Sequence, residues 1–397
     1  MAAKPEDVST APTEGAGLFS GAGPEKQPEP NPVAESADKK DGGDAVDSAT
    51  AAVADLSVDE KKEEAEPTEV TPEATAPASA AAPEVAASDA KPEPSTVTPT
   101  QGPIWPETAP EHPLTKFYDA FEALTAEAQH NEVYGIELSK SKPFHTKLIL
   151  QKFLRANQND LEKAKSQLLD TLKWRKEFDP IKAAGETFAK NKFDGLGYVL
   201  EVEGVPESPN KKDIVTFNIY GAVKDNKATF GDLDGYAPPF STPCKEAMLT
   251  KPHSFLRWRV GLMEKSVQAL NLPAATTPIP NFGEGPDPYQ GFQIHDYLQV
   301  SFLRRDPLVK TATNKTIEIL GRHYPETLSR KFFVNVPVVM GWLFNAMKLV
   351  VAKETSKKFV VLSYGNQLAA ELGKGVPKSY GGERGELAEC AEGMKME

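Results

Sequence analysis

A histidine and a tyrosine stand two positions apart, at His295 and Tyr297, within a segment that predicts a strand over residues 292–302. Successive side chains of a strand point to opposite faces, so these two leave the same face and could enter one pocket. A tyrosine that has lost its proton can bind haem iron as an axial ligand. However, a tyrosine or histidine on a central strand is more typical of a packed core, and these two residues alone leave both interpretations open.

The elements that would position these side chains alternate between strands and helices. Strands are predicted over residues 198–202, 214–220, 292–302, 331–336 and 359–363, and helices over 254–270, 308–323 and 338–352. This alternation is typical of βαβ units, in which helices pack against a mostly parallel sheet. We therefore predict an α/β domain over residues 190–383, followed by a C-terminal tail over 384–397.

A helical segment precedes this domain. Apolar residues recur at helical spacing between residues 114 and 180, and Asp160 stands where it could cap the helix that carries Leu161, Leu168 and Leu172 on one face. Asp179 and Pro180 should end that helix. The sequence therefore predicts a small helical N-terminal lobe over residues 114–180.

The first hundred residues differ in composition from the rest. They contain 21 acidic residues, 7 lysines and 13 of the 34 prolines, a net charge of −14, whereas the remainder carries 36 acidic and 38 basic residues. With Phe19 as the single aromatic residue, such a segment cannot bury enough apolar surface to offset the entropy cost of ordering. We expect residues 1–110 to be a disordered acidic tail. The near-neutral remainder lacks the basic excess typical of nucleic-acid-binding proteins, so no nucleic acid partner is expected.

Cysteine usage and hydropathy indicate the compartment. Cys244 and Cys390 are the two cysteines of the chain, and they form neither a disulfide framework nor a zinc-binding spacing. The N-terminal residues have no apolar stretch typical of a secretory signal, and the most apolar stretch, residues 332–351, is interrupted by polar residues and a proline. We expect a cytoplasmic protein.

An ordered set of motifs over residues 114–383 resembles the CRAL-TRIO family of lipid-transfer proteins. The motifs are Phe153-Leu154-Arg155-Ala156, Trp174-Arg175, Tyr324-Pro325-Glu326, Phe333-Val334-Asn335-Val336-Pro337, Gly341-Trp342, Lys358-Phe359-Val360-Val361-Leu362 and Tyr380-Gly381-Gly382. None is specific alone, but their order and spacing together match the family. The resemblance implies a CRAL-TRIO fold, with a helical N-terminal lobe and a mixed, mostly parallel sheet flanked by helices around an apolar cavity.

Residues 257–265, 295–297 and 331–337 are similar to the fungal non-classical phosphatidylinositol transfer proteins that also bind haem. The resemblance implies that haem b lies in the cavity with Tyr297 as the axial ligand of its iron, and that Arg259, His295 and Lys331 also contact it. Cations suit the haem propionates or the phenolate. At Asn157 the haem-binding relative has a phenol side chain, so that contact is missing or replaced here.

The same resemblance implies a site for the inositol phosphate headgroup, formed by Glu326 and Lys358, with Arg155 as a further candidate. A lysine supplies charge to a phosphate, and a glutamate accepts hydrogen bonds from inositol hydroxyls. A carboxylate at a helix end and a lysine at a strand start are also ordinary on a protein surface.

Residues 338–352 are apolar on nearly all sides, which is typical of a buried helix. In the family the corresponding element is a gate that lines the cavity and moves at the membrane, and Trp342 would suit an interface with lipid. A simple core helix is the alternative.

No hydrolase, metalloprotease or nucleotide-binding motif is present, so we expect no enzyme. The resemblance implies a phosphatidylinositol transfer protein that binds phosphatidylinositol and haem, with roles in phosphoinositide homeostasis and oxidant stress. It also implies a cytoplasmic protein that associates peripherally with endoplasmic reticulum or microsomal membrane. The alternative is a lipid-occupancy sensor or scaffold that regulates a lipid kinase without haem.

Overall fold

The computed structural model describes residues 102–233, 254–300, 306–338 and 358–397. Two predictions therefore lie outside the described residues: nearly all of the acidic tail, and the apolar helix that contains Trp342.

The N-terminal lobe consists of three helices and a two-stranded hairpin. They are α2 (Pro113–Ala128), β1 (Glu132–Val133), β2 (Ile136–Glu137), α3 (Pro143–Ala156) and α4 (Leu161–Phe178). The side chain of Asp160 accepts hydrogen bonds from the backbone N–H groups of Glu162 and Lys163, so it caps α4 as its position in the sequence predicts. The helix ends at Asp179, which has a left-handed backbone with φ of 52° and precedes the proline that begins α5 (Pro180–Gly185).

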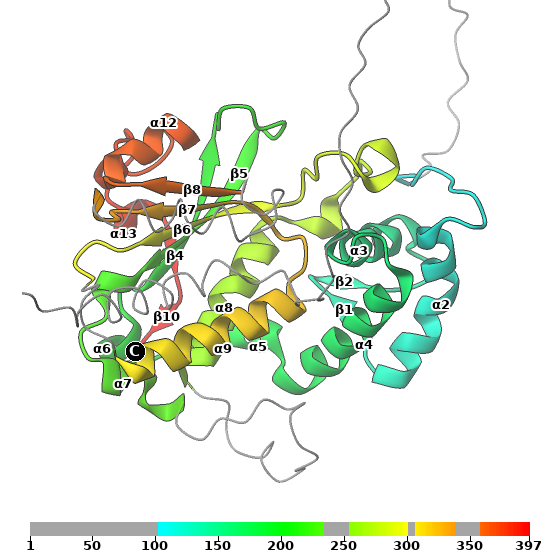
Figure 1. Ribbon diagram of the computed structural model, residues 1–397, viewed down its shortest axis with the longest axis horizontal. Helices are drawn as coiled ribbons and strands as arrows, with labels where there is room; N and C mark the ends of the chain where they lie inside the picture. The colour runs from blue at the N-terminus through cyan, green and yellow to red at the C-terminus, as the bar shows by residue number, and fades with distance from the viewer. Residues whose placement is uncertain (1–101, 234–253, 301–305, 339–357) are drawn as a thin grey trace, which may run out of the picture. The chain divides into compact units, whose positions relative to one another are not determined.

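The second part of the chain forms a six-stranded sheet among the described residues, in the order β8-β7-β6-β5-β4-β9. The strands are β4 (Gly197–Glu203), β5 (Lys212–Ile219), β6 (Gly291–Asp296), β7 (Leu328–Val334), β8 (Phe359–Leu362) and β9 (Glu392–Gly393). Strands β5 to β8 are parallel, and β4 is antiparallel to both of its neighbours. The predicted mixed, mostly parallel sheet is confirmed (Figure 1).

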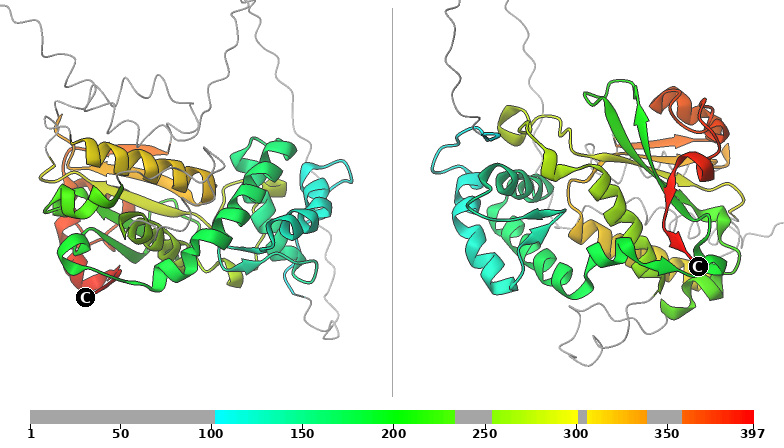
Figure 2. Two further views of the ribbon diagram at one scale, coloured as in Figure 1. Left: turned by 90° about the horizontal axis from the view of Figure 1, so that it is seen from below. Right: turned by 180° about the vertical axis from the view of Figure 1, so that it is seen from behind.

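Helices cover both faces of this sheet (Figures 1 and 2). One face packs against α8 (Ser254–Ala269), with α9 (Pro307–His323) beside α8, and Thr216 on β5 donates a hydrogen bond to Ser266 on α8. The other face packs on α12 (Leu368–Leu372), η8 (Lys378–Tyr380) and α13 (Leu387–Cys390). The remaining short elements are β3 (Thr187–Phe188), α6 (Lys190–Phe193), η1 (Tyr220–Ala222), α7 (Asn226–Phe230), η2 (Gly231–Leu233), η4 (Leu272–Ala274), η5 (Asn281–Gly283), η7 (Gly365–Gln367) and β10 (Lys395–Met396).

The strand register places a row of residues across the sheet on its α8 face. Gly197, Asn218, His295, Phe333 and Val361 are paired successively from β4 to β8. The residues before them in β5, β6 and β7 face the opposite way and form an apolar cluster with α12. The row therefore marks the floor of any site between the sheet and α8 or α9.

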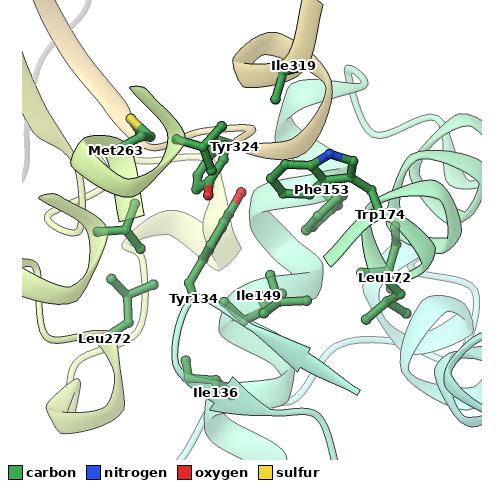
Figure 3. Packing of buried hydrophobic residues seen from close by; sticks show 14 of the residues in the cluster. Tyr134, Ile136, Ile149, Phe153, Leu172, Trp174, Met263, Leu272, Ile319 and Tyr324 are labelled. Atoms are coloured by element: carbon green, nitrogen blue, oxygen red, sulfur yellow. The ribbon is translucent and has the colours of Figure 1, made fainter. Parts of the chain in front are cut away.

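One hydrophobic core joins the N-terminal lobe to α8 and α9, as Figure 3 shows. Tyr134, from the lobe, stacks on Tyr324, which follows α9, with 5.7 Å between ring centroids. Beside them, the Arg175 guanidinium on α4 lies 2.8 Å from the Glu264 carboxylate on α8, and Tyr324 donates a hydrogen bond of 2.7 Å to the same carboxylate. Arg175 and Glu264 are both buried, so removing either one would leave the other as a buried charge without its partner.

The C-terminal residues differ from the tail that the sequence predicts over 384–397. Strand β9 pairs with β4, β10 pairs with β3, and Met394 between them is buried in the main core. The segment is short and largely polar, so it has no local signal of a strand; its pairing partners come from positions about two hundred residues earlier in the chain.

Candidate functional site

A cavity of about 160 Å³ lies between the sheet, α8 and the end of α9. Its lining includes five of the seven residues proposed for ligand binding: Arg259, His295, Glu326, Lys331 and Lys358. They come from α8, β6, the α9–β7 connection, β7 and the residue before β8. The structure therefore brings three of the four haem candidates and two of the three lipid candidates to a single cavity.

Tyr297 follows β6 directly instead of lying within it, because the strand ends at Asp296 and not near residue 302 as predicted. Its backbone N–H still donates to the Val334 carbonyl at 3.0 Å, which keeps it aligned with β7. The Tyr297 ring is 7% exposed. It lies beside the Tyr220 and Phe333 rings, which also contact the His295 ring. Tyr297 and His295 therefore share one face of the sheet, although Tyr297 is not part of the described cavity lining.

The end of β6 is held by the Asp296 carboxylate, which the sequence analysis did not single out. Its Oδ1 accepts hydrogen bonds from the Leu298 N–H at 2.8 Å and from Asn335 Nδ2 at 2.7 Å. Its Oδ2 accepts a hydrogen bond of 2.6 Å from Tyr380. Burial, and then the Asp296 carboxylate, raise the pKa of the Tyr380 phenol, so this hydroxyl stays protonated and donates. The carboxylate thus fixes the backbone on both sides of Tyr297.

Glu326 is held from several directions at the polar end of the cavity. It has a left-handed backbone with φ of 53°, and its Oε2 accepts a hydrogen bond of 2.7 Å from Gln290. Arg155 Nε lies 3.6 Å from Glu326 Oε2, and Lys358 Nζ lies 3.9 Å from Glu326 Oε1. The three predicted headgroup residues therefore meet, although Arg155 and Lys358 stand more than two hundred positions apart in the sequence.

Lys152 on α3 is a further residue of this region that the sequence analysis did not find. It is fully buried, and its ammonium group donates to Asp287 Oδ2 at 2.6 Å and to the carbonyls of Tyr289 and Glu326 at 2.9 Å. Burial lowers the pKa of Lys152, and Asp287 opposes that shift. The feature of the sequence that could have identified Lys152 is its charge within the mostly apolar run from Leu148 to Leu154. Lys152 places Glu326 by holding its backbone carbonyl.

The residues around Tyr297 fit a haem in the type of their donors. A phenol oxygen suits ferric iron, and Arg259 and Lys331 in the adjoining cavity suit carboxylates. Sites for small molecules typically measure about 300–1,000 Å³. The cavity of about 160 Å³ is smaller. It has room for a lipid headgroup, whereas a whole lipid or a haem would require it to widen.

No helix in the described ranges is long and apolar enough to span a membrane.

Comparison with known families and proteins identifies related chains. Residues 249–382 match the CRAL/TRIO domain, and residues 113–170 match the CRAL/TRIO N-terminal domain. A protein named phosphatidylinositol transfer protein SFH5 from Phaeosphaeria nodorum is 71% identical over 302 residues, which cover 76% of this chain and 86% of that protein. A protein of the same name from Cryptococcus neoformans var. neoformans serotype D is 44% identical over 301 residues, which cover 74% of this chain and 94% of the relative.

The fold is also similar to a solved structure described as the crystal structure of Sfh5. The two share 28% sequence identity with a TM-score of 0.55, and the match covers 70% of this chain and 90% of the solved one.

Proposed function

The chain belongs to the CRAL/TRIO family, and we propose that it transfers phosphatidylinositol between membranes, the activity for which its SFH5 relatives are named. The observation that carries this proposal is the convergence of Arg155 and Lys358 on Glu326, with Glu326 and Lys358 lining one cavity.

The spacing of these three residues suits a phosphorylated polyol. The contacts of Glu326 with Arg155 and Lys358, at 3.6 and 3.9 Å, are longer than the roughly 2.7–2.9 Å of a direct charge-assisted hydrogen bond. A phosphate could therefore approach the two cations without breaking a tight ion pair. Lys358 is also 36% exposed at its side chain, so an entering ligand can reach it. The Glu326 carboxylate would then accept hydrogen bonds from inositol hydroxyls.

We expect Lys358→Ala to reduce phosphatidylinositol transfer between vesicles about tenfold, the effect of losing one charge-assisted contact worth about 1.4 kcal/mol. Lys374→Ala is the matched control, because Lys374 is exposed and paired with Glu383 away from the cavity. The measurement is the rate at which labelled phosphatidylinositol moves from donor to acceptor vesicles. Equal rates for Lys358→Ala and the parent protein would contradict the headgroup assignment.

We further propose that haem b binds in the widened cavity with Tyr297 as the axial ligand and with Arg259, His295 and Lys331 around it. Bound haem would supply a ferric iron centre. The support lies in the donor types and in the contacts of Tyr220 and Phe333 with both His295 and Tyr297. The chain's own contribution is a largely buried Tyr297 side chain and, in the adjoining cavity, the cations of Arg259 and Lys331, which suit the haem propionates.

The absorption spectrum of the purified protein tests this second proposal. We expect a Soret band, and we expect Tyr297→Phe to abolish or shift it because the substitution removes the oxygen ligand. Tyr364→Phe is the control, since Tyr364 is 63% exposed and follows β8. Protein that shows no Soret band after haem supplementation would exclude haem binding, and an unchanged band in Tyr297→Phe would exclude this ligand.

A transfer protein must meet membranes, and we propose peripheral contact with endoplasmic reticulum or microsomal membrane by a cytoplasmic protein. Exposed large apolar side chains follow three adjacent strands, Leu298 after β6, Val338 after β7 and Tyr364 after β8, and they support such contact. Roles in phosphoinositide homeostasis and oxidant stress would follow from the two ligands.

A further inference from the structure

A loop formed by residues 279–287, which the function proposed above does not use, holds one side of the Arg155 guanidinium. The loop includes the short helix η5. Arg155 Nη1 donates hydrogen bonds to the carbonyl oxygens of Gly283 and, at 2.8 Å, of Gly285. Because the guanidinium is a rigid planar fork, these two contacts fix the direction in which its other nitrogens point.

The opposite edge of this guanidinium, formed by Nε and Nη2, holds no oxygen atom of the described residues. Arg155 Nε is buried there without a hydrogen-bond partner. Glu326 Oε2 lies 3.6 Å from Nε, which is longer than the roughly 2.7–2.9 Å of a charge-assisted hydrogen bond. Since Glu326 lines the cavity, the Nε–Nη2 edge lies beside the polar end of that cavity.

Arg257 on α8 has the same arrangement with its second edge occupied. Its Nη1 also donates to backbone carbonyls, those of Phe178 and Asp179. Its Nε and Nη2 both donate to the Glu186 carboxylate. Arg155 has the backbone half of this arrangement and lacks the oxyanion. A phosphate has two oxygens that fit such an edge in the same bidentate manner.

The loop adopts a backbone conformation that side chains normally avoid. Asn281, Phe282 and Gly283 are consecutive left-handed residues, with φ of 51°, 53° and 94°. Phe282 gains no burial from this conformation, since it is 58% exposed. Such residues persist where the surrounding structure imposes them, and they cluster at ligand clamps. Here the conformation places two backbone carbonyls on Arg155.

Helix α3 holds the loop in this conformation through two further side chains. Lys152 forms the buried ion pair with Asp287 at the end of the loop. Gln151 is 1% exposed and covers Gly283, so that a Cβ atom on Gly283 would lie only 2.3 Å from Gln151 Cδ. Gln151 and Arg155 are four positions apart and therefore lie on one face of α3. That face and the loop fit together only while position 283 is glycine.

We propose that the 279–287 loop positions Arg155 so that its Nε–Nη2 edge receives two oxygens of a phosphate ester, with Gln151 and Gly283 as positioning residues. The cations of Arg155 and Lys358 flank the single carboxylate of Glu326, which leaves one net positive charge and favours an anion. The inference rests on the proposed function, whose headgroup phosphate is the expected occupant. A free phosphate ion has the same chemistry, and the experiment separates the two.

The probes are myo-inositol 1-phosphate, myo-inositol and inorganic phosphate. The readout is the Nε–H resonance of Arg155 in the full-length protein, assigned by its loss in Arg155→Lys. We expect myo-inositol 1-phosphate to shift this resonance in a saturable manner. It should bind at least about tenfold more tightly than either other probe, because it alone contacts Arg155 and Glu326 together. Inorganic phosphate that binds equally tightly would overturn the headgroup as the occupant.

Gly283→Ala tests the loop without changing a residue that touches the ligand. Its Cβ atom collides with Gln151, so the carbonyl that holds Arg155 must move. We expect the affinity for myo-inositol 1-phosphate to fall about tenfold and the weaker affinity for myo-inositol to stay as in the parent. Gly204→Ala is the matched control, because Gly204 also has a positive φ, of 71°, but nothing lies within 4 Å of a Cβ atom there.

Gln151→Ala is the second variant, which keeps the test decisive if Gly283→Ala does not fold. It adds no strain and removes the packing on Gly283, and it should weaken myo-inositol 1-phosphate binding about threefold, again without an effect on myo-inositol. The proposal is overturned if both variants bind as the Gly204→Ala control does, or if they weaken both inositol probes by the same factor, as general damage would. In those cases the parent protein still binds myo-inositol 1-phosphate. A parent that binds none of the probes would instead contradict the headgroup site itself, and this proposal with it.

Discussion

His323, the last residue of α9, shows how burial sets the charge of one side chain. It is 3% exposed, stacks on Trp174 with 4.3 Å between ring centroids, and its Nδ1 lies 3.3 Å from the Thr171 hydroxyl. Burial, and then the charges of Arg322 and Arg175, lower the pKa of His323 from 6.5 to about 3. The imidazole therefore remains neutral in the folded protein at any pH near neutrality.

This pKa shift predicts a dependence of stability on pH. In the unfolded chain His323 takes up a proton below about pH 6.5, whereas in the folded protein it does so only near pH 3. The unfolded state thus binds more protons between these pH values. The free energy of unfolding therefore falls by about 2 kcal/mol as the pH is lowered from 6.5 to 5. His323→Phe keeps the ring on Trp174 and cannot titrate. Urea unfolding at pH 7.5 and pH 5 should show a smaller loss of stability in this variant, and equal losses would contradict a neutral His323.

At the scale of elements, the site depends on connections between the N-terminal lobe and the sheet domain. Lys152 on α3 and Asp287 in the loop before β6 form a buried ion pair at 2.6 Å, with both side chains fully covered. The same lysine holds the Glu326 carbonyl, so α3 sets the position of a headgroup residue 174 positions away. The N-terminal lobe therefore helps to form the site as well as packing beside it.

Removing one partner of this pair should be costly. Lys152→Met leaves the Asp287 carboxylate buried without its cation, and we expect a loss of about 3–5 kcal/mol in the free energy of unfolding. The double variant Lys152→Met with Asp287→Leu removes both charges and should recover most of that loss. Urea unfolding of the two single variants and the double variant forms a complete cycle. If the double variant loses as much free energy of unfolding as the two single variants lose together, the two charges are not coupled.

At the scale of the whole molecule, the two ends of the chain differ in their relation to the fold. The last residues add β9 to the main sheet and β10 to β3, and the Glu397 N–H donates to the Phe188 carbonyl at 3.0 Å. Met394 is 5% exposed within the main hydrophobic cluster. The first hundred residues have the composition of a chain that cannot form a core.

Two deletions should therefore have opposite outcomes. Deleting residues 392–397 removes Met394 and two strand pairings, and we expect a loss of at least about 2 kcal/mol of stability, comparable to truncating a buried methionine. Deleting residues 1–100 should leave the melting temperature, lipid transfer and any haem spectrum unchanged. Thermal unfolding of both truncated proteins beside the full chain is the measurement. A stable protein without residues 392–397, or a destabilised one without residues 1–100, would contradict this division.

Local patterns in the sequence determined most of the elements. The alternation of strands and helices, the apolar spacing around Leu161 and Leu168, and the cap at Asp160 depend on neighbours within a few positions. The described residues contain the helices and strands that these patterns predict there, although the strand predicted over 292–302 ends at Asp296. The helix predicted over 338–352 lies outside the described residues except at Val338. The family motifs also named Arg259, His295, Glu326, Lys331 and Lys358, which line one cavity.

Only the tertiary structure decided which distant side chains meet. The pairing of Lys152 with Asp287, the contacts of Asp296 with Asn335 and Tyr380, and the strands formed by residues 392–397 all join segments that are far apart in the chain. Such contacts leave no local period, because hydrogen bonds and ion pairs depend on where the backbone returns in space.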